Sequence, residues 1–303
     1  SALGHGPEIH VLGGWPIYGA GRGEVVRGEI GLFRTHALRP VLNSPEQIEA
    51  WRAVGAPGPA TLQIDTGMNR LGLEPHEFAA IGVPEGVELV MSHLACADEP
   101  GHPMNAAQLA AFREMTDGLQ VRRSLAQTGG ILLGAEFAFD LVRPGIGVFG
   151  GLPFAEARTV VTLELPVLQV RDVAPGESVG YGASWTAERP ARIATLSGGY
   201  ADGLHRLLSN RAEGFVKGIA CPFAGRVSMD LIGLDVTDAP EIGPGGMVEI
   251  LGPHQSVDRL AAVTGTIGYE VLTTLGRRYA RRHTRPIARF EMGGRAPCRR
   301  PGG

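Results

Sequence analysis

Short apolar runs alternate with amphipathic stretches along the first half of the chain. Runs typical of buried strands occupy residues 9–14, 61–65, 87–93, 124–128 and 141–145. Strands that alternate with helices indicate parallel strands joined by crossover helices. We count about six strands in this half, whereas a closed TIM-type (β/α)8 barrel has eight. The pattern therefore predicts an α/β half, built as an incomplete barrel or as an open parallel sheet.

The amphipathic stretches between these runs carry helix signals. Ser44 is a candidate N-cap, with Pro45 in the first helical position and Gln47 three residues after the cap. Further helices are expected through residues 75–80 and over residues 105–115, where apolar side chains recur one turn apart. Helices at these places supply the crossovers that parallel strands require.

The second half of the chain changes to β-rich patterns. Residues 160–170, 191–196 and 247–251 read as strands separated by Gly and Pro, which predicts a mostly β domain. A short helical stretch over residues 257–279 closes it, and the Gly-, Pro- and Arg-rich end of the chain is typical of disorder. We therefore expect three regions, which are a partial (β/α) barrel over residues 1–157, a C-terminal β domain with short helices over residues 158–290, and a disordered tail over residues 291–303.

Composition narrows the class of protein. The chain has 303 residues, 44% of them apolar, and a net charge of −3, which excludes a disordered protein and gives no sign of nucleic-acid or membrane partners. Three cysteines without CxxC spacing argue against a disulfide framework, and no apolar run reaches the length of a membrane span. A cytoplasmic protein is the expectation. Among the 28 basic residues only Lys217 is a lysine, so any chemistry that needs a lysine amine must use that residue or do without.

Polar residues follow the predicted strands of the first half. Arg70, His93, Thr128 and Arg143 each stand at or just beyond the C-terminal end of a strand. These ends form the active face of a barrel. An arginine suits a carboxylate, and the backbone N–H groups of a Gly-rich turn such as residues 143–147 suit a phosphate. Each segment alone is better explained as a surface arginine or as a turn that needs glycine.

A tyrosine and a cluster of metal-ligand residue types also stand out. Tyr200 stands between glycines directly after a strand of the second half. A tyrosine acts as a base only where cationic neighbours favour its phenolate, and the simpler interpretation is a packed aromatic in a turn. His93, Cys96 and Asp98, with His102 nearby, have metal-ligand chemistry, but no matching second pair exists in the sequence. We expect no metal.

Seven segments in a fixed order are far more specific than any one of them. They are IDTGMNRLGL (64–73), SHLACADE (92–99), RPGIGVFGG (143–151), ESVGYGASW (177–185), GGYADGLHR (198–206), GRVSMD (225–230) and GTIGYE (265–270). Together they resemble alanine racemase, a family of pyridoxal-phosphate enzymes of barrel-plus-β-domain build. The resemblance runs from about residue 9 to residue 282 and implies an isomerase.

The resemblance implies a role for each matching residue. Tyr200 holds the place of the base that works on the L-enantiomer, Arg70 that of the arginine for the substrate carboxylate, and Met229 that of a backbone contact. Arg143 matches the arginine that faces the pyridine nitrogen of the cofactor. Because arginine only donates, it keeps that nitrogen unprotonated and restrains side reactions. His93 matches a histidine beside Arg143, where a cationic Arg–His pair would favour the phenolate. The phosphate contacts carry over to Thr128, Gly145, Ile146 and Tyr269.

The resemblance also implies a lysine for which this chain offers no match. Racemisation needs one acid–base group on each face of the substrate joined to the cofactor. In the family the second base is the Schiff-base lysine, in an AxxKxNAYGHG-like motif at the end of the first barrel strand. That motif does not occur here, and Lys217 is predicted at a β-hairpin tip. We expect this chain alone to be inactive, with the first two βα units outside it. Gln63 stands where some members have a carbamylated lysine, and a neutral glutamine there could hydrogen-bond Arg70 instead.

Three interpretations stay open within this resemblance. The first is an alanine racemase that makes D-alanine for peptidoglycan precursors, as a head-to-tail homodimer in which Tyr200 acts in the partner's barrel. The second is a degenerate homologue that binds cofactor or a partner without catalysis, and the retained Tyr200, Arg70 and Arg143 argue against it. The third is a broad-specificity racemase or a decarboxylase of the same build. The GYADG and GRVSMD segments favour a racemase over a decarboxylase.

Overall fold

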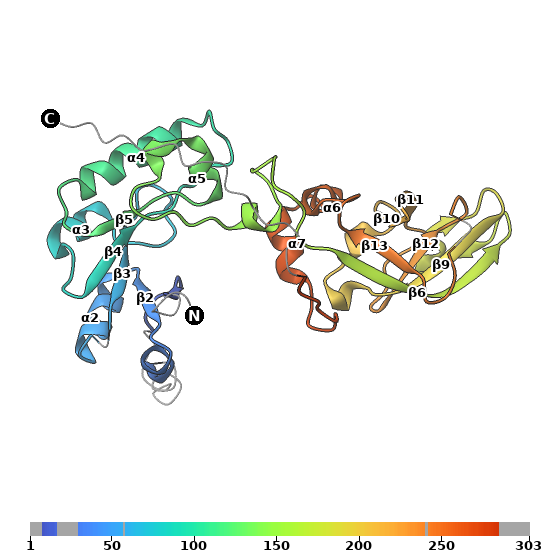
Figure 1. The fold of residues 1–303 in the computed structure, drawn as a ribbon, viewed down its shortest axis with the longest axis horizontal. Coiled ribbons are helices and arrows are strands. Elements are labelled where there is room, and N and C mark those ends of the chain that lie inside the picture. The colour runs from blue at the N-terminus through green and yellow to red at the C-terminus, as the bar shows by residue number, and fades with distance from the viewer. Residues whose placement is uncertain (1–7, 17–29, 57, 240–241, 285–303) are drawn as a thin grey trace.

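The computed structural model describes residues 8–16, 30–56, 58–239 and 242–284. Figure 1 shows two lobes, a blue and green N-terminal one and a yellow and orange C-terminal one, each built around its own sheet. The first sheet is parallel and the second antiparallel, so the predicted fold class, a partial barrel followed by a mostly β domain, is confirmed. The tail expected over residues 291–303 lies outside the described residues.

The N-terminal sheet has five strands, all parallel, in the order β1-β2-β3-β4-β5. Each strand pairs with its neighbour along the chain, as in the wall of a barrel. The carboxyl ends of all five strands lie at one edge, which carries the turns after β3, β4 and β5. The strands are β1 (His10–Val11), β2 (Arg39–Leu42), β3 (Ala60–Gln63), β4 (Val87–Met91) and β5 (Arg122–Ser124).

Two details of the strand prediction differ from the structure. The described residues form five strands of this sheet rather than about six, and the run over residues 141–145 is not among them, since it makes only a single bridge, from Arg143 to Gln127. A longer ladder would need the Gly145 N–H to donate to a backbone carbonyl. This N–H donates to the Thr128 hydroxyl instead, so the ladder stops there. The sequence pattern also missed β2, whose four residues begin with Arg and Pro.

Among the described residues, four complete helices connect or follow these strands, three of them at the predicted places. Ser44 caps the first by accepting a hydrogen bond from the Gln47 N–H at 3.3 Å, as the sequence indicates. The helices pack on the sheet around a core that includes the fully buried Trp51, Leu62 and Phe112. This core fixes the strand ends that carry the polar residues. The helices are α2 (Pro45–Ala53), α3 (Pro75–Ile81), α4 (Pro103–Thr116) and α5 (Thr128–Leu133).

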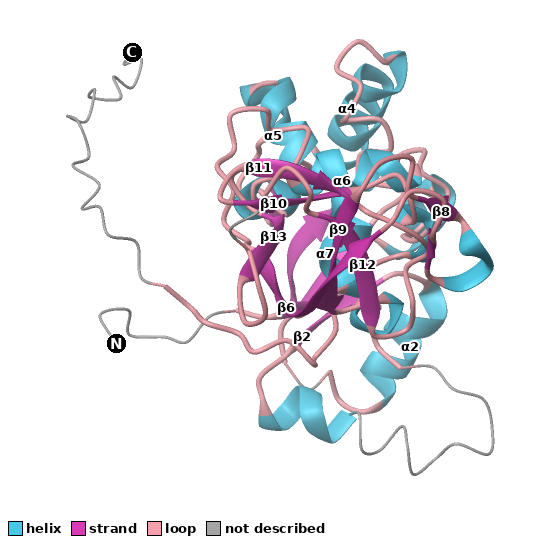
Figure 2. Cartoon of the chain, turned by 90° about the vertical axis from the view of Figure 1, so that its right-hand side faces the viewer, coloured by secondary structure: helices cyan, strands magenta, loops and turns pink. Residues whose placement is uncertain are grey.

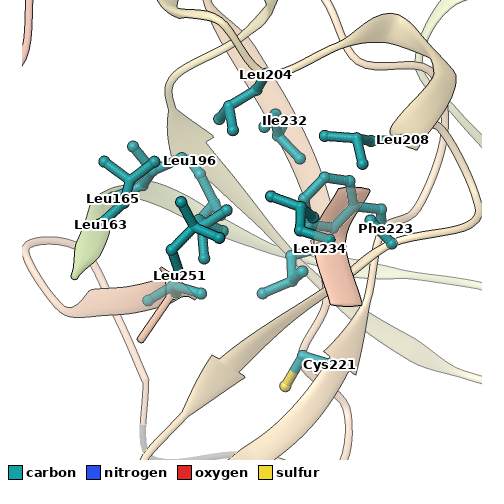
Figure 3. Packing of buried hydrophobic residues seen from close by; sticks show 14 of the residues in the cluster. Leu163, Leu165, Leu196, Leu204, Leu208, Cys221, Phe223, Ile232, Leu234 and Leu251 are labelled. Atoms are coloured by element: carbon teal, nitrogen blue, oxygen red, sulfur yellow. The ribbon is translucent and has the colours of Figure 1, made fainter. Parts of the chain in front are cut away.

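The C-terminal lobe is an antiparallel sheet of six strands in the order β11-β10-β13-β6-β9-β12. Alternate side chains along the strands turn toward one core, and Figure 3 shows Leu196, Phe223, Ile232 and Leu234 of that core. A separate two-stranded ribbon, β7 with β8, lies outside this sheet. The strands are β6 (Leu163–Val173), β7 (Ser178–Val179), β8 (Trp185–Thr186), β9 (Ala191–Ser197), β10 (Glu213–Val216), β11 (Ile219–Pro222), β12 (Leu231–Asp235) and β13 (Met247–Leu251).

Two helices close the second lobe, α6 (Val257–Thr264) and α7 (Gly268–Thr274). Figure 2 shows both beside the antiparallel sheet, and Leu260, Ala261 and Val271 belong to its core. Among the described residues, 3-10 turns are η1 (Ala135–Phe137), η2 (Ile146–Phe149), η3 (Tyr181–Ala183), η4 (Tyr200–Asp202) and η5 (Arg206–Leu208).

Lys217 lies in the turn between β10 and β11, as predicted from the sequence. Val216 pairs with Ile219, so only Lys217 and Gly218 form the loop. Both have positive φ, 50° and 83°, which is the geometry of the two-residue hairpin turn that matches strand twist. The only lysine of the chain therefore belongs to the β domain and not to the barrel lobe.

Candidate active site

Arg143 is a partly buried cation at the carboxyl edge of the parallel sheet. Its Nη1 donates to the Ser124 hydroxyl at 2.5 Å, and its Nη2 donates to the carbonyls of Ser92 at 2.6 Å and Leu125 at 3.2 Å. No carboxylate is among these partners. Burial lowers the pKa of Arg143 to about 10, which leaves the guanidinium protonated near neutral pH. Arg143 therefore presents a fixed positive charge, held by the ends of β4 and β5.

His93 follows β4 and lies against this cation. Nη2 of Arg143 is 3.4 Å from Nδ1 of His93. Because arginine only donates, Nδ1 is the acceptor and the neutral ring carries its proton on Nε2. Burial, together with the charges of Arg143 and Arg70, lowers the pKa of His93 to about 4. His93 is therefore neutral near pH 7, and the expected cationic Arg–His pair is wrong, because Arg143 alone carries the charge.

Arg70 stands in the turn after β3, on the same edge of the sheet. Asp65 holds this turn, since its Oδ1 accepts hydrogen bonds from the N–H groups of Gly67 and Met68, both at 2.8 Å. The Arg70 side chain is exposed, and its charge contributes to the lowered pKa of His93. A second positive charge, accessible from solvent, thus stands on the same edge as Arg143.

Gln63 has a different partner from the one expected. Its Nε2 donates to the carbonyl of Leu71 at 2.9 Å, and no described hydrogen bond joins it to the Arg70 side chain, which was the possibility that the sequence left open. Arginine has donors only, so a glutamine could serve Arg70 through its oxygen alone. Gln63 instead fixes the backbone directly after Arg70.

Three successive backbone N–H groups converge on two hydroxyls where the lobes meet. Thr128 Oγ1 accepts from the Gly145 N–H at 2.9 Å and the Gly147 N–H at 3.4 Å, and Tyr269 Oη accepts from the Ile146 N–H at 3.4 Å. A Cβ at Gly145 would lie 3.3 Å from Tyr269 Oη, so a side chain there would crowd this point. Successive N–H groups that face one point form an anion-binding concavity. The structure thus brings together the four residues predicted to contact a phosphate.

Tyr200 begins η4 in the β domain, beside Met229. The Tyr200 N–H donates to the Ser228 carbonyl and the Ala201 N–H to the Met229 carbonyl, each at 3.0 Å. The side chains of Tyr200 and Met229 are 44% and 54% exposed. A Cβ at Gly199 would lie 2.3 Å from the Ser228 carbonyl oxygen, so only glycine lets the two turns approach so closely. The two turns therefore form one unit that presents both residues to solvent.

The predicted site residues fall into two groups within one chain. Arg70, His93 and Arg143 share the carboxyl edge of the parallel sheet, next to the N–H cradle of residues 145–147. The contacts described for Tyr200 stay within the β domain. A single chain therefore does not join this tyrosine to the Arg143–His93 pair.

Three buried polar residues support these groups and were not singled out from the sequence. Gln108, on the buried face of α4, donates to the His93 carbonyl at 3.0 Å. Ser124 accepts the Nη1 hydrogen bond of Arg143, and Asp202 holds the Tyr200 turn from within. A polar residue on the apolar face of an amphipathic helix is a signal that would have found Gln108. Ser124 and Asp202 carry no comparable signal, because serines in strands and aspartates in turns are common.

The described part of the chain contains neither a membrane-crossing helix nor a metal-ligand cluster. None of its helices combines the length and the apolar character that a crossing requires. No group of three His, Cys, Asp or Glu side chains converges within it. Cys96, part of the short His/Cys/Asp segment, places its Sγ 3.8 Å from the sulfur of Met104 instead.

Two protein-family models match the chain. The model described as alanine racemase, N-terminal domain, matches residues 21–153, and the model described as alanine racemase, C-terminal domain, matches residues 160–283. The two matches meet between the parallel sheet and β6, where the fold itself changes from one sheet to the other.

Relatives and solved structures agree with these matches. An alanine racemase of Cereibacter sphaeroides is 54% identical over 286 residues, which are 93% of this chain and 78% of the relative. The biosynthetic alanine racemase of Pseudomonas aeruginosa has a TM-score of 0.81 at 37% identity, over 94% of this chain and 81% of that one. The alanine racemase of Bartonella henselae, solved with covalently bound pyridoxal phosphate, has a TM-score of 0.80 at 37% identity, over 91% and 79%. The chain therefore belongs to the alanine racemase family, and its enzyme class is an isomerase of that type.

Proposed function

We propose that the chain binds pyridoxal 5'-phosphate on the carboxyl edge of its parallel sheet and supplies Tyr200 as one of the two proton-transfer groups that racemise alanine. The observation that carries this proposal is the cradle of three N–H groups beside a partly buried arginine. The cradle suits a phosphate, and the arginine suits a ring nitrogen. The D-alanine formed would serve the synthesis of peptidoglycan precursors.

The residues present fit the phosphate and the ring of this cofactor. In the structure the N–H groups of residues 145–147 are satisfied only by the hydroxyls of Thr128 and Tyr269, both of which can also donate to a phosphate oxygen. Gly145 leaves this point open, because a side chain there would meet Tyr269. Arg143 can only donate, so it would hold the pyridine nitrogen as an acceptor.

The covalent anchor is the part that this chain does not supply. Lys217 is its only lysine and lies at the tip of the β10–β11 hairpin, in the second lobe of Figure 1. We propose that these 303 residues alone hold the cofactor through its phosphate and ring only, and that they do not racemise alanine. The residue for the second face of the substrate is absent from the barrel lobe for the same reason.

Each residue at the edge would have a distinct task. Pyridoxal phosphate, when bound, supplies an electron sink that makes the α-proton of the attached amino acid acidic. Tyr200 would remove or return that proton at its Oη. Arg70 would hold the substrate carboxylate from the solvent side, where its guanidinium can form two parallel hydrogen bonds. The Met229 N–H, which no described hydrogen bond uses, would orient the same carboxylate.

The placement of Tyr200 supports a shared site in a homodimer. Tyr200 and Met229 are exposed on the β domain and make no described contact with the barrel edge of their own chain. We propose that two chains pair head to tail, so that Tyr200 of each chain serves the barrel of the other. Mixed dimers test this, provided that both chains are joined to an N-terminal segment with the family's lysine motif. A Tyr200→Phe chain and a chain without that lysine should together recover one competent site, and no recovery would count against the shared site.

Cofactor binding is the direct test of the proposed site. Titration of the chain with pyridoxal phosphate, followed by absorbance, should show saturable binding that pyridoxal without phosphate does not match. Tyr269→Phe should weaken this binding, while Tyr181→Phe, on the exposed η3 turn, should leave it unchanged. Borohydride treatment followed by mass spectrometry should give no adduct on the barrel lobe. Equal binding of the two compounds would refute the phosphate cradle.

Complementation of a bacterium that requires D-alanine tests the activity. The chain alone should fail to support growth, and the chain joined to an N-terminal segment with the family's lysine motif should succeed. Growth with the chain alone would overturn the proposed inactivity. Failure of the joined chain would instead favour the non-catalytic homologue.

A further inference from the structure

Arg278, which lies just after α7, joins the two turns that present Tyr200 and Met229. Its Nε lies 3.1 Å from Oδ1 of Asp202, in the Tyr200 turn, and its Nη1 lies 2.7 Å from Oδ1 of Asp230, which follows Met229. One guanidinium thus spans two carboxylates, each one or two residues from a proposed site residue. The planar fork of arginine allows this double contact, whereas the ammonium of a lysine is a single point charge.

Asp202 depends on this contact because it is buried. Its side chain is 6% exposed, and its other oxygen, Oδ2, accepts the Gly199 N–H at 3.0 Å. A buried carboxylate needs a compensating charge or a complete set of hydrogen bonds. Removal of Arg278 leaves the Asp202 carboxylate with the Gly199 N–H as its one described hydrogen-bond donor.

The chain segment after α7 adds further contacts to the same turn. The Gly276 N–H donates to the Asp202 carbonyl at 3.1 Å, and the Thr274 hydroxyl donates to the Gly203 carbonyl at 3.3 Å. A Cβ at Gly203 would lie 2.1 Å from the Thr274 carbonyl oxygen, so the segment packs tightly on the turn. The segment from Thr274 to Arg278 therefore packs against the Tyr200 turn, and Arg278 supplies its charged contact.

We propose that Arg278 is a positioning residue, which holds the Tyr200 ring and the Met229 N–H in one fixed arrangement through Asp202 and Asp230. The inference rests on the proposed role of Tyr200 for its meaning in catalysis. Its structural content does not depend on that role, because the position of the Tyr200 ring can be measured whether or not the ring is a base.

The experiment is fluorine NMR of the full chain labelled with 3-fluorotyrosine. The chain has five tyrosines, and the Tyr200 signal is the one lost in Tyr200→Phe. In Arg278→Gln this signal should shift and broaden, while the signals of Tyr181 and Tyr269 stay in place. Arg278→Lys keeps the charge without the fork and should restore the signal only in part. Arg277→Gln is the matched control, since Arg277 is the exposed neighbour, has no described side-chain contact, and gives the same charge change.

Hydrogen exchange measured on the same variants provides a second readout. Exchange in the peptides that contain residues 198–203 and 226–231 should become about tenfold faster or more in Arg278→Gln, as expected when a buried carboxylate loses its charged hydrogen-bond donor. The β10–β11 hairpin should exchange at an unchanged rate. If Arg278→Gln fails to fold, Asp230→Asn removes only the more exposed of the two contacts and should shift the Tyr200 signal in the same direction. An unchanged Tyr200 signal in a folded Arg278→Gln or Asp230→Asn chain would overturn the proposal.

Discussion

His93 makes the stability of the barrel lobe depend on pH. The ring is partly buried against Arg143, and burial with the charges of Arg143 and Arg70 lowers its pKa to about 4. In the unfolded chain the same group takes its ordinary pKa of about 6.5. As pH falls, the unfolded chain binds a proton at His93 before the folded chain does. The free energy of unfolding therefore has its full value, as far as His93 is concerned, above about pH 6.5 and decreases progressively as the pH falls toward 4.

The magnitude follows from these two pKa values. Between pH 7.5 and pH 5, linkage gives a loss of about 2 kcal/mol for a fully shielded histidine. Solvent reaches part of the His93 ring, and screening reduces this figure to roughly 1 kcal/mol. In His93→Gln the titrating group is gone, so the loss of stability between the two pH values should be smaller than in the unchanged chain by about this amount.

Urea unfolding at pH 7.5 and pH 5 measures the effect. Trp15 and Trp51 are buried in the barrel lobe, so tryptophan fluorescence reports its unfolding. His76→Gln is the matched control, because the His76 side chain is 77% exposed and should leave the pH dependence unchanged. If His93→Gln lost as much stability between the two pH values as the unchanged chain, the assigned neutral state of His93 would be refuted.

Three further predictions concern single contacts. Ser124→Ala removes the acceptor that faces Arg143 Nη1 and should cost about 1–3 kcal/mol in urea unfolding, and a loss near zero would contradict the hydrogen bond. Gly199→Ala forces apart the turns of the candidate site and should lower the thermal midpoint, whereas Gly243→Ala, with open space around its Cβ, should not. Leu196 is fully buried in the β-domain core, so Leu196→Ala should lower the free energy of unfolding by about 2–5 kcal/mol. Chemical denaturation followed by circular dichroism measures this loss, and an unchanged free energy of unfolding would contradict the packing.

The sequence predicts most of the architecture because its signals are local. Ser44 caps α2 where the spacing of its neighbours indicates, and Lys217 stands in a hairpin turn next to a glycine. The prediction of a strand over residues 141–145 was wrong. The composition of this run suits a strand, but the Thr128 hydroxyl accepts the hydrogen bond of the N–H that would continue the ladder. Such competition between side chain and backbone depends on tertiary contact and leaves no trace in local pattern.

The sequence predicts which residues form the candidate site, but it does not predict their charge states. The resemblance to the family is enough to select Arg143, His93 and Thr128. The charge state of His93 is decided by how deeply Arg143 and the ring are buried together, which only the packed structure shows. Arg278 is one of 27 arginines and stands outside the seven recognised segments, so only its two carboxylate contacts distinguish it from the others.

Helix α7 has a consequence for communication between sites. Its second residue, Tyr269, contacts the N–H cradle of residues 145–147, and its last residue, Thr274, contacts the turn of Tyr200. Seven helical residues span only about 10 Å, so these two contacts are separated by less than two full turns of helix. In the proposed dimer these contacts belong to different active sites. One short helix would then join the phosphate contact of one active site to the proton-transfer turn of the other.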